Sequence, residues 1–527
     1  MRPLQSSFVA ALLLATASAA NPPTVTVKNG SYYGVYQDTY DQDLFLGMPY
    51  AQPPVGDLRF RNPEPLNSTW SDSKNATEYS PECYGYGSDQ WVLGNVISED
   101  CLTINVVRPS GISEDAKLPV GFWIHGGAYV QGGNRDPRYN FSYLIDEATK
   151  AGKPFIGVSI NYRLHGFGFL WGSSVEEAGV GNLGLKDQRL ALHWVNENIA
   201  SFGGDPNKVT IWGESAGAGS VGHQLVAFGG RDDGLFWGGI MQSGAPINGP
   251  SKYTNASAFD VYYNNITAAT NCSSVEDTLA CLRQVPVAQL SAILNSSVTS
   301  STPFYPVVDG EFIEKAGFTL MNEGKFVHVP ILHGTNHDEG TAFGTTGIDT
   351  TDEFLEYVKS VTDSAEDAAV LADLYPDIPE VGIPGTSKQR HSTWAANNVT
   401  SYSYVFNVLV NGLSQYLGST HFQEVAFVFY NLDGNGYNNS VSADPFLNQP
   451  ETFTLLARTM SSMWTSFIVD QMPNSNNVTE IEWPVYTLDD PQNIVFDVNV
   501  SNVAYTEPDV YRAEGIAYIS SGYSKLN

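Results

Sequence analysis

The pattern of apolar and polar residues changes once along the chain. Residues 24–36 (TVTVKNGSYYGVY) alternate in a way that predicts an antiparallel hairpin. From about residue 100, apolar runs typical of strands alternate with helical segments. The strand-like runs are 101–107 (CLTINVV), 118–127 (LPVGFWIHGG), 153–161 (KPFIGVSIN), 208–213 (KVTIWG), 236–244 (FWGGIMQSG) and 329–336 (VPILHGTN). Apolar strands separated by helices predict an α/β fold with a mostly parallel sheet and helices on both faces.

One of the intervening helices is expected over roughly residues 184–202. Leu192, Val195, Ile199 and Phe202 recur there at spacings of three and four, which places them on one helical face. The chain shows no internal repeat and no low-complexity linker that would mark a domain boundary. Its 527 residues can bury a large core in one big α/β domain or in two domains.

The N-terminus is typical of a signal peptide. Arg2 precedes a short apolar run (FVAALLL, 8–14), and the small residues ATASAA follow, with cleavage expected after Ala19 or Ala20. A membrane anchor would need about 20 apolar residues, so we expect secretion without stable membrane insertion. Numerous glycosylation sequons agree with export. The twelve candidates are Asn29, Asn67, Asn75, Asn140, Asn255, Asn265, Asn271, Asn295, Asn398, Asn438, Asn477 and Asn499.

Net charge limits the possible binding partners, and the four cysteines bear on disulfide bonds and metal sites. The formal net charge is −30, from 56 acidic against 26 basic residues, which disfavours nucleic acid and anionic lipid as partners. The four cysteines allow three pairings, of which Cys83–Cys101 and Cys272–Cys281 would close two local loops in an oxidising compartment. No CxxC spacing or interleaved histidine supports a metal site.

The candidate nucleophile is Ser215, in the sequence GESAG (213–217). This Gly-X-Ser-X-Gly pattern suits a serine on a tight strand-to-helix turn, and here a predicted strand precedes it and small residues able to start a helix follow. Because ligand sites in such sheets lie at the carboxyl ends of the strands, the position favours catalysis over a plain loop. Ser243 ends another strand, but Met241 and Ala245 stand where the two flanking glycines would be.

A serine nucleophile needs an oxyanion hole, a base and an acid. The loop His125-Gly126-Gly127-Ala128 follows a strand and offers backbone N–H donors, although a plain turn would use the same glycines. Among the nine histidines, His421 has the late position that the order serine, acid, histidine requires; it opens a polar turn expected to lead into an apolar strand (VAFVF). His193, His328 and His333 are expected to be structural. Asp338 and Glu339 both follow a strand, and their chemistry alone does not choose between them.

Long stretches of the chain resemble one family. FGGDPNKVTIWGESAG (202–217) and EDCLTINVV (99–107) are similar to the two signatures of type-B carboxylesterases, the group of cholinesterases and fungal lipases. FLGMPYAQPPVGDLRF (45–60) and NYRLHGFGFL (161–170) resemble further segments of it. The similarity runs from about residue 25 to the last strands and implies one α/β-hydrolase domain over residues 20–527.

The resemblance also implies roles for residues. Ser215 is then the nucleophile, Glu339 the acid and His421 the base, with no cofactor. The oxyanion donors fall on Gly127, Ala128 and Ala216; Ala128 stands where the family usually has a third glycine, and still supplies its N–H. The family also pairs its cysteines between near neighbours.

The expected activity is hydrolysis of small-molecule or lipid carboxylic esters. Members of this family that act only in adhesion typically lose triad residues, whereas all three stand here. A lipase is the main alternative, but the loop between Cys83 and Cys101 holds only 17 residues, which is short for a long interfacial lid.

Residues in two segments are expected to influence which substrates fit. Trp91 lies where cholinesterases place a choline-stacking tryptophan, although simple pocket packing is the more common use of such a residue. Ser300 and Thr302 occupy the positions of bulky acyl-pocket aromatics in acetylcholinesterases, so longer acyl groups are expected to fit. Phe304 or Tyr305 would fill that space if the loop folds differently.

Overall fold

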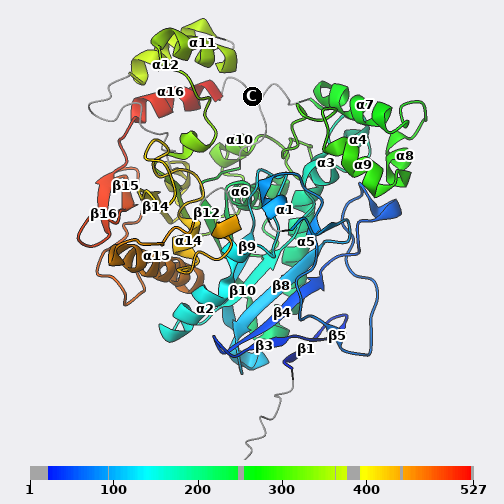
Figure 1. The fold of residues 1–527 in the computed structure, drawn as a ribbon, viewed down its shortest axis with the longest axis horizontal. Coiled ribbons are helices and arrows are strands. Elements are labelled where there is room, and N and C mark those ends of the chain that lie inside the picture. The colour runs from blue at the N-terminus through cyan, green and yellow to red at the C-terminus, as the bar shows by residue number, and fades with distance from the viewer. Residues whose placement is uncertain are drawn as a thin grey trace, which may run out of the picture.

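A large mixed sheet forms the centre of the molecule in the computed structural model, which describes residues 22–92, 94–246, 255–362, 364–376, 392–439 and 443–523 (Figure 1). The predicted signal peptide lies outside these residues. The sheet has eleven strands in the order β16-β15-β14-β13-β12-β11-β9-β10-β8-β4-β3. Along the chain they are β3 (Val35–Gln37), β4 (Gln42–Pro49), β8 (Thr103–Pro109), β9 (Leu118–Ile124), β10 (Ile156–Ile160), β11 (Gly204–Glu214), β12 (Gly238–Gln242), β13 (Ile331–Asn336), β14 (Ser401–Phe406), β15 (Gln492–Phe496) and β16 (Ala504–Pro508).

The middle of this sheet is parallel. Neighbouring strands from β10 through β15 pair in parallel, whereas β8, β4 and β3 at one edge and β16 at the other add antiparallel pairs. Each of the six apolar runs named in the sequence analysis overlaps one of these strands. The carboxyl ends of β9, β11 and β13 therefore meet along one edge of the sheet, where a ligand site is expected.

Helices cover both faces of the sheet, and neighbouring strand residues point to opposite faces. Phe122 joins the core under α5 (Leu183–Asn198) and α6 (Ala216–Gly230), whereas Trp123 joins the core under α2 (Phe141–Lys150) and α15 (Glu451–Asp470). Because helices cover both faces, the central strands are buried on both sides and mostly apolar, without a strict alternation. The predicted helix at 184–202 is α5, completed by a 3-10 turn (Ile199–Phe202).

The N-terminal hairpin is confirmed, and one predicted strand is wrong. β1 (Thr24–Val27) pairs antiparallel with β2 (Gly30–Tyr33), and β5 (Lys74–Asn75) adds to β2 in parallel. The run VAFVF, expected as a strand after His421, is the short helix α14 (Val425–Val428). Its residues are all buried, and a short run that is apolar on every side carries no period that separates strand from helix.

The remaining elements lie around the sheet. Helices α7 to α9 gather at one corner of the molecule, and α11, α12 and α16 gather at another (Figure 1). These elements are β6 (Glu82–Cys83), α1 (Ser88–Val92), β7 (Ile97–Ser98), α3 (His165–Phe169), α4 (Ser173–Glu177), α7 (Asp260–Ala269), α8 (Thr278–Gln284), α9 (Val287–Leu294), α10 (Gly317–Asn322), α11 (Thr351–Thr362), α12 (Ala365–Leu374), α13 (Ser392–Ala396) and α16 (Ala513–Tyr523). Within the described ranges, no helix is both long and apolar enough to cross a membrane.

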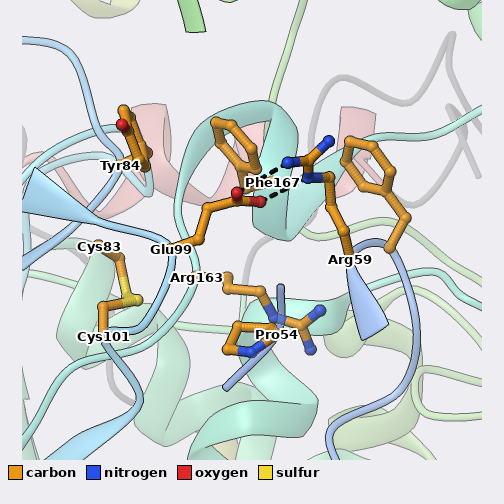
Figure 2. A pocket seen from close by; sticks show the side chains of 9 residues that line it. Pro54, Arg59, Cys83, Tyr84, Glu99, Cys101, Arg163 and Phe167 are labelled. Carbon is orange, nitrogen blue, oxygen red and sulfur yellow. Dashed lines mark hydrogen bonds and ion pairs between the residues drawn. A yellow bond between two sulfur atoms is a disulfide. The ribbon is translucent and has the colours of Figure 1, made fainter. Parts of the chain in front are cut away.

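Two disulfides and a buried ion pair fasten the peripheral loops. Cys83 bonds to Cys101, and Cys272 bonds to Cys281, which confirms the near-neighbour pairing. Figure 2 shows the first disulfide beside the ion pair between Arg59 and Glu99, whose atoms Nη2 and Oε2 lie 2.8 Å apart. Arg59 also donates to the carbonyl oxygens at the end of α8, so this buried guanidinium ties the disulfide loop to that helix.

Candidate active site

Ser215 occupies a sharp turn between β11 and α6. Its backbone has φ 57° and ψ −123°, a conformation that costs a non-glycine residue about 1–3 kcal/mol. A Cβ added at Gly213 would lie 2.5 Å from the carbonyl carbon of Gly217, and one added at Gly217 would overlap the carbonyl oxygen of Ile124. Both glycines of the motif are therefore required for the turn to pack against the neighbouring strand.

The predicted oxyanion loop lies directly against this turn. A Cβ added at Gly126 would lie 2.7 Å from the Glu214 carbonyl oxygen and 3.1 Å from the Ser215 Cβ. The next three residues, Gly127, Ala128 and Tyr129, have φ values of 93°, 54° and 61°. Ala128 is exposed, and Ala216 begins α6 immediately after Ser215. The loop that carries Gly127 and Ala128 thus begins beside the serine, and Ala216 follows the serine directly.

His421 and Glu339 meet across two separate loops. Nδ1 of His421 lies 2.5 Å from Oε2 of Glu339, and the other Glu339 oxygen accepts a hydrogen bond of 2.8 Å from the backbone N–H of Asn336. Both side chains are 14% exposed, so they are shielded without being sealed from solvent. A carboxylate on Nδ1 leaves Nε2 as the nitrogen that can accept a proton.

Asp338 has a different contact. Its Oδ2 accepts a 2.8 Å hydrogen bond from the N–H of Ser419, and its own N–H donates to the Ser419 carbonyl oxygen at 2.9 Å. This reciprocal pair holds together the loops that carry Glu339 and His421. The geometry therefore gives the two neighbouring acids separate contacts.

Two buried acids that sequence reasoning missed complete the surroundings. Glu214 Oε1 lies 3.1 Å from Nε2 of His421. Glu424 accepts hydrogen bonds from Gln242 Nε2 at 3.0 Å and from Asn336 Nδ2 at 2.8 Å. Their signals were present in the sequence, because Glu214 is the variable residue of the motif and Glu424 follows His421 by three positions.

The acids and the histidine shift one another's proton affinity. Burial raises the pKa of Glu214 well above its usual range, and burial together with Glu339 raises the pKa of Glu424. Burial lowers the pKa of His421, but Glu214 and Glu339 outweigh it and raise that pKa to about 9. With a pKa of about 9, the His421 imidazole is protonated at neutral pH, and it faces the Glu214 carboxyl group.

Several residues considered from the sequence lie in structural positions. His125 stacks on Tyr162 with ring centres 4.4 Å apart, and burial lowers its pKa to about 4, so it is neutral. Ser243 directly follows β12, and its N–H donates to the Gly334 carbonyl oxygen. Gly244, which follows it, packs against the Ser215 carbonyl oxygen.

The residues expected to govern substrate choice differ in their surroundings. Ser300 is exposed and its hydroxyl donates to the Ser297 carbonyl oxygen at 3.1 Å, whereas Thr302 has a buried hydroxyl without a hydrogen-bond partner. Phe304 is buried, with its ring centre 4.0 Å from that of His165. The side chain of Trp91 lies outside the described part of the chain. In that part, no group of three or more His, Cys, Asp or Glu side chains is arranged to hold a metal ion.

Comparison with known proteins identifies the family. Residues 21–378 match the model of the carboxylesterase family. The chain belongs to this family. It is 34% identical to Lipase 4 of Diutina rugosa, with 97% of this chain and 98% of that protein aligned. It is also 36% identical to Secreted lipase 1 of Botryotinia fuckeliana, covering 70% of this chain and 68% of that one.

A solved structure agrees in fold over nearly the whole chain. The crystal structure of Aspergillus niger EstA superposes with a TM-score of 0.79 at 29% identity, covering 95% of this chain and 98% of that one. The architecture is that of α/β-hydrolase esterases, as the sequence predicted. The chain is a carboxylic-ester hydrolase.

Proposed function

We propose that this esterase works through an acyl-enzyme on a Ser215–Glu339–His421 triad. The contact between His421 Nδ1 and Glu339 Oε2 at 2.5 Å carries the proposal, since it orients the imidazole and compensates its positive charge. The strained turn at Ser215 supports it further, because it exposes the hydroxyl ahead of the N-terminus of α6.

Each step moves one proton between serine, histidine and the substrate oxygens. Ser215 Oγ attacks the ester carbonyl carbon as His421 Nε2 takes the hydroxyl proton, and the N–H groups of Gly127, Ala128 and Ala216 bind the oxyanion. The C–O bond to the alcohol then breaks, and His421 returns the proton to the leaving oxygen. Water repeats the sequence on the acyl-enzyme, which releases the carboxylic acid and restores Ser215.

The test is turnover of p-nitrophenyl butyrate by the wild-type protein and by Ser215→Ala. Wild-type turnover with a loss of several orders of magnitude in the variant is expected, because triad members act as a unit. Ser243→Ala is the matched control, since it removes the other strand-end hydroxyl near the site. Turnover that survives in Ser215→Ala would refute the assignment.

We also propose that the protein is a secreted glycoprotein and that residues 20–527 form one domain. Two disulfides support an oxidising compartment. Ten of the twelve sequon asparagines are exposed, whereas Asn29 and Asn140 are half-buried. The Asn140 oxygen caps α2 by accepting from the Ser142 N–H at 3.0 Å. Mass spectrometry of the mature protein from its culture medium tests cleavage after Ala19 or Ala20 and the occupied sites.

A triacylglycerol lipase is the second candidate, supported by the names of the curated relatives. Comparing rates on emulsified tributyrin and on dissolved p-nitrophenyl butyrate separates the two. An esterase gains no rate when substrate exceeds its solubility, whereas a lipase does. Butyrylthiocholine added as a third substrate tests the cholinesterase-like alternative, in which Trp91 would bind the cation.

A further inference from the structure

The oxyanion loop is strained and needs support from outside itself. Three consecutive residues, Gly127 to Tyr129, have positive φ values, and two of them carry a Cβ. The loop's own hydrogen bonds are few, with the N–H groups of Val130 and Gln131 both donating to the Gly127 carbonyl oxygen. Such conformations persist only where the surrounding structure enforces them.

One segment supplies much of that support. It comprises residues 82–90, the start of the loop that the Cys83–Cys101 disulfide closes, and is called here the brace segment. Its Tyr86 N–H donates to the Val130 carbonyl oxygen at 2.7 Å. The side-chain amide of Gln90 makes two reciprocal hydrogen bonds of 3.0 Å with the backbone of Gly132, one in each direction.

Further contacts join the brace segment to residues 130–138. The Asp89 N–H donates to Gln131 Oε1 at 3.2 Å, and its carboxylate pairs with Arg138 at 3.0 Å. A Cβ added at Gly85 would lie 2.7 Å from the Val130 carbonyl oxygen. The brace segment therefore fits closely onto the chain that leaves the oxyanion loop.

We infer that Gln90 is a positioning residue for the oxyanion hole, acting through Gly132. This role rests on the proposed triad function, and it explains what keeps the oxyanion hole rigid. Gln90 is 1% exposed and Gly132 is buried, so water does not replace the two hydrogen bonds if they are lost. The loop would then relax, and its N–H groups would leave the position of the developing oxyanion.

Gln90→Leu removes both hydrogen bonds. We expect its kcat/KM on p-nitrophenyl butyrate to fall about 10- to 100-fold. Gln284→Leu is the matched control, because Gln284 is exposed and hydrogen-bonds only Asp57 in the described structure. Its kcat/KM should equal that of the wild type.

Two readouts separate positioning from a structural role. The burst of p-nitrophenol, which counts competent Ser215 sites, should keep its amplitude in Gln90→Leu. The affinity for an aryl trifluoromethyl ketone, whose adduct places an oxyanion in the hole, should fall by the same factor as kcat/KM. A kcat/KM within twofold of the wild type, or a loss matched by a loss of burst amplitude, would overturn the inference.

Hydrogen exchange of the wild-type protein provides a test that needs no variant. The Tyr86 and Gly132 N–H groups should exchange slowly and as one unit, because each bridges the brace segment and the oxyanion loop. Rapid exchange at Gly132 would contradict the inference even if Gln90→Leu fails to fold. A wild-type protein without ester turnover would refute the proposed triad function instead, while leaving this exchange pattern as expected.

Discussion

Nε2 of His421 lies 3.1 Å from Oε1 of Glu214, the residue just before the proposed nucleophile. Among the described residues, no hydrogen bond joins Ser215 Oγ to His421. The nitrogen that would accept the serine proton therefore faces a buried carboxyl group in the resting enzyme. Because His421 is protonated at neutral pH, substrate turnover depends on the pH at which its proton leaves.

The pH profile of the wild type should reflect this proton. A general base must be neutral to act, and the pKa of His421 is raised from 6.5 to about 9. We therefore expect kcat/KM to rise with pH through neutrality and to level off only above about pH 9. In Glu214→Gln the pH midpoint of the kcat/KM profile should move down toward 6.5, because this variant lacks the charge that raises the pKa of His421 most.

The control for this shift is Glu197→Gln, which changes an exposed acid paired with Lys28. Its midpoint should match the wild type, so that a change in total charge alone is excluded. Equal midpoints in Glu214→Gln and in the wild type would show that Glu214 does not set the proton affinity of the base.

The two neighbouring acids should differ in their effect on catalysis. Glu339→Gln removes the charge that faces the imidazole, so kcat should fall by several orders of magnitude. Asp338→Asn weakens the contacts of this side chain with Ser419 and His337 and leaves the Glu339–His421 contact in place, so it should lower thermal stability and keep most of kcat. Steady-state kinetics and a thermal melt of each variant distinguish a loss of catalysis from a loss of stability. A larger loss of kcat in Asp338→Asn than in Glu339→Gln would show that Asp338 is the acid.

A buried carboxyl group near the disulfide should make stability depend on pH. Neither oxygen of Glu82 has a hydrogen-bond partner, and burial raises its pKa from 4.5 to about 8. The folded state thus keeps a proton that the unfolded chain releases above pH 4.5, so stability falls as pH rises toward 8. The cost at pH 7 is on the order of 3 kcal/mol.

Glu82→Met should therefore raise the melting temperature at pH 7 and flatten its fall between pH 5 and 8. Glu82→Gln should flatten the slope with a smaller gain, because it leaves unpaired polar atoms in the same place. Melting curves at several pH values provide the measurement. A Glu82→Met protein that melts below the wild type at pH 7 would contradict this account.

The acyl-chain preference should depend on Phe304. We expect wild-type kcat/KM to be higher for butyrate to octanoate p-nitrophenyl esters than for acetate. Phe304→Ala opens space beside His165 and should favour octanoate over butyrate further, by up to about 0.8 kcal/mol for each newly buried methylene. Tyr305→Ala is the control, since Tyr305 is exposed. A wild-type maximum at acetate, or an unchanged profile in Phe304→Ala, would count against this pocket.

Local sequence patterns were sufficient to predict the turn at Ser215 and the central sheet. The glycines around Ser215 and the uninterrupted apolar strands predicted the turn and the sheet, because each reflects a constraint between near neighbours. Contacts between distant segments leave no such pattern. The pairing of Gln90 with Gly132, and of His421 with Glu214, arises only once the strands bring their ends together. The sequence did not predict the helix at 425–428. A short run that is apolar on every side has no hydrophobic period that separates helix from strand, so its packing in the core determines its secondary structure.

The most direct test of the central claim is to trap the acyl-enzyme. The wild-type protein is mixed with p-nitrophenyl butyrate, quenched in acid within the first turnover, and digested for peptide mass spectrometry. The proposed triad predicts a butyryl group on the peptide that contains Ser215, and none on that peptide in Ser215→Ala. Rapid turnover with no butyryl group on Ser215, or with the group on Ser243, would contradict it.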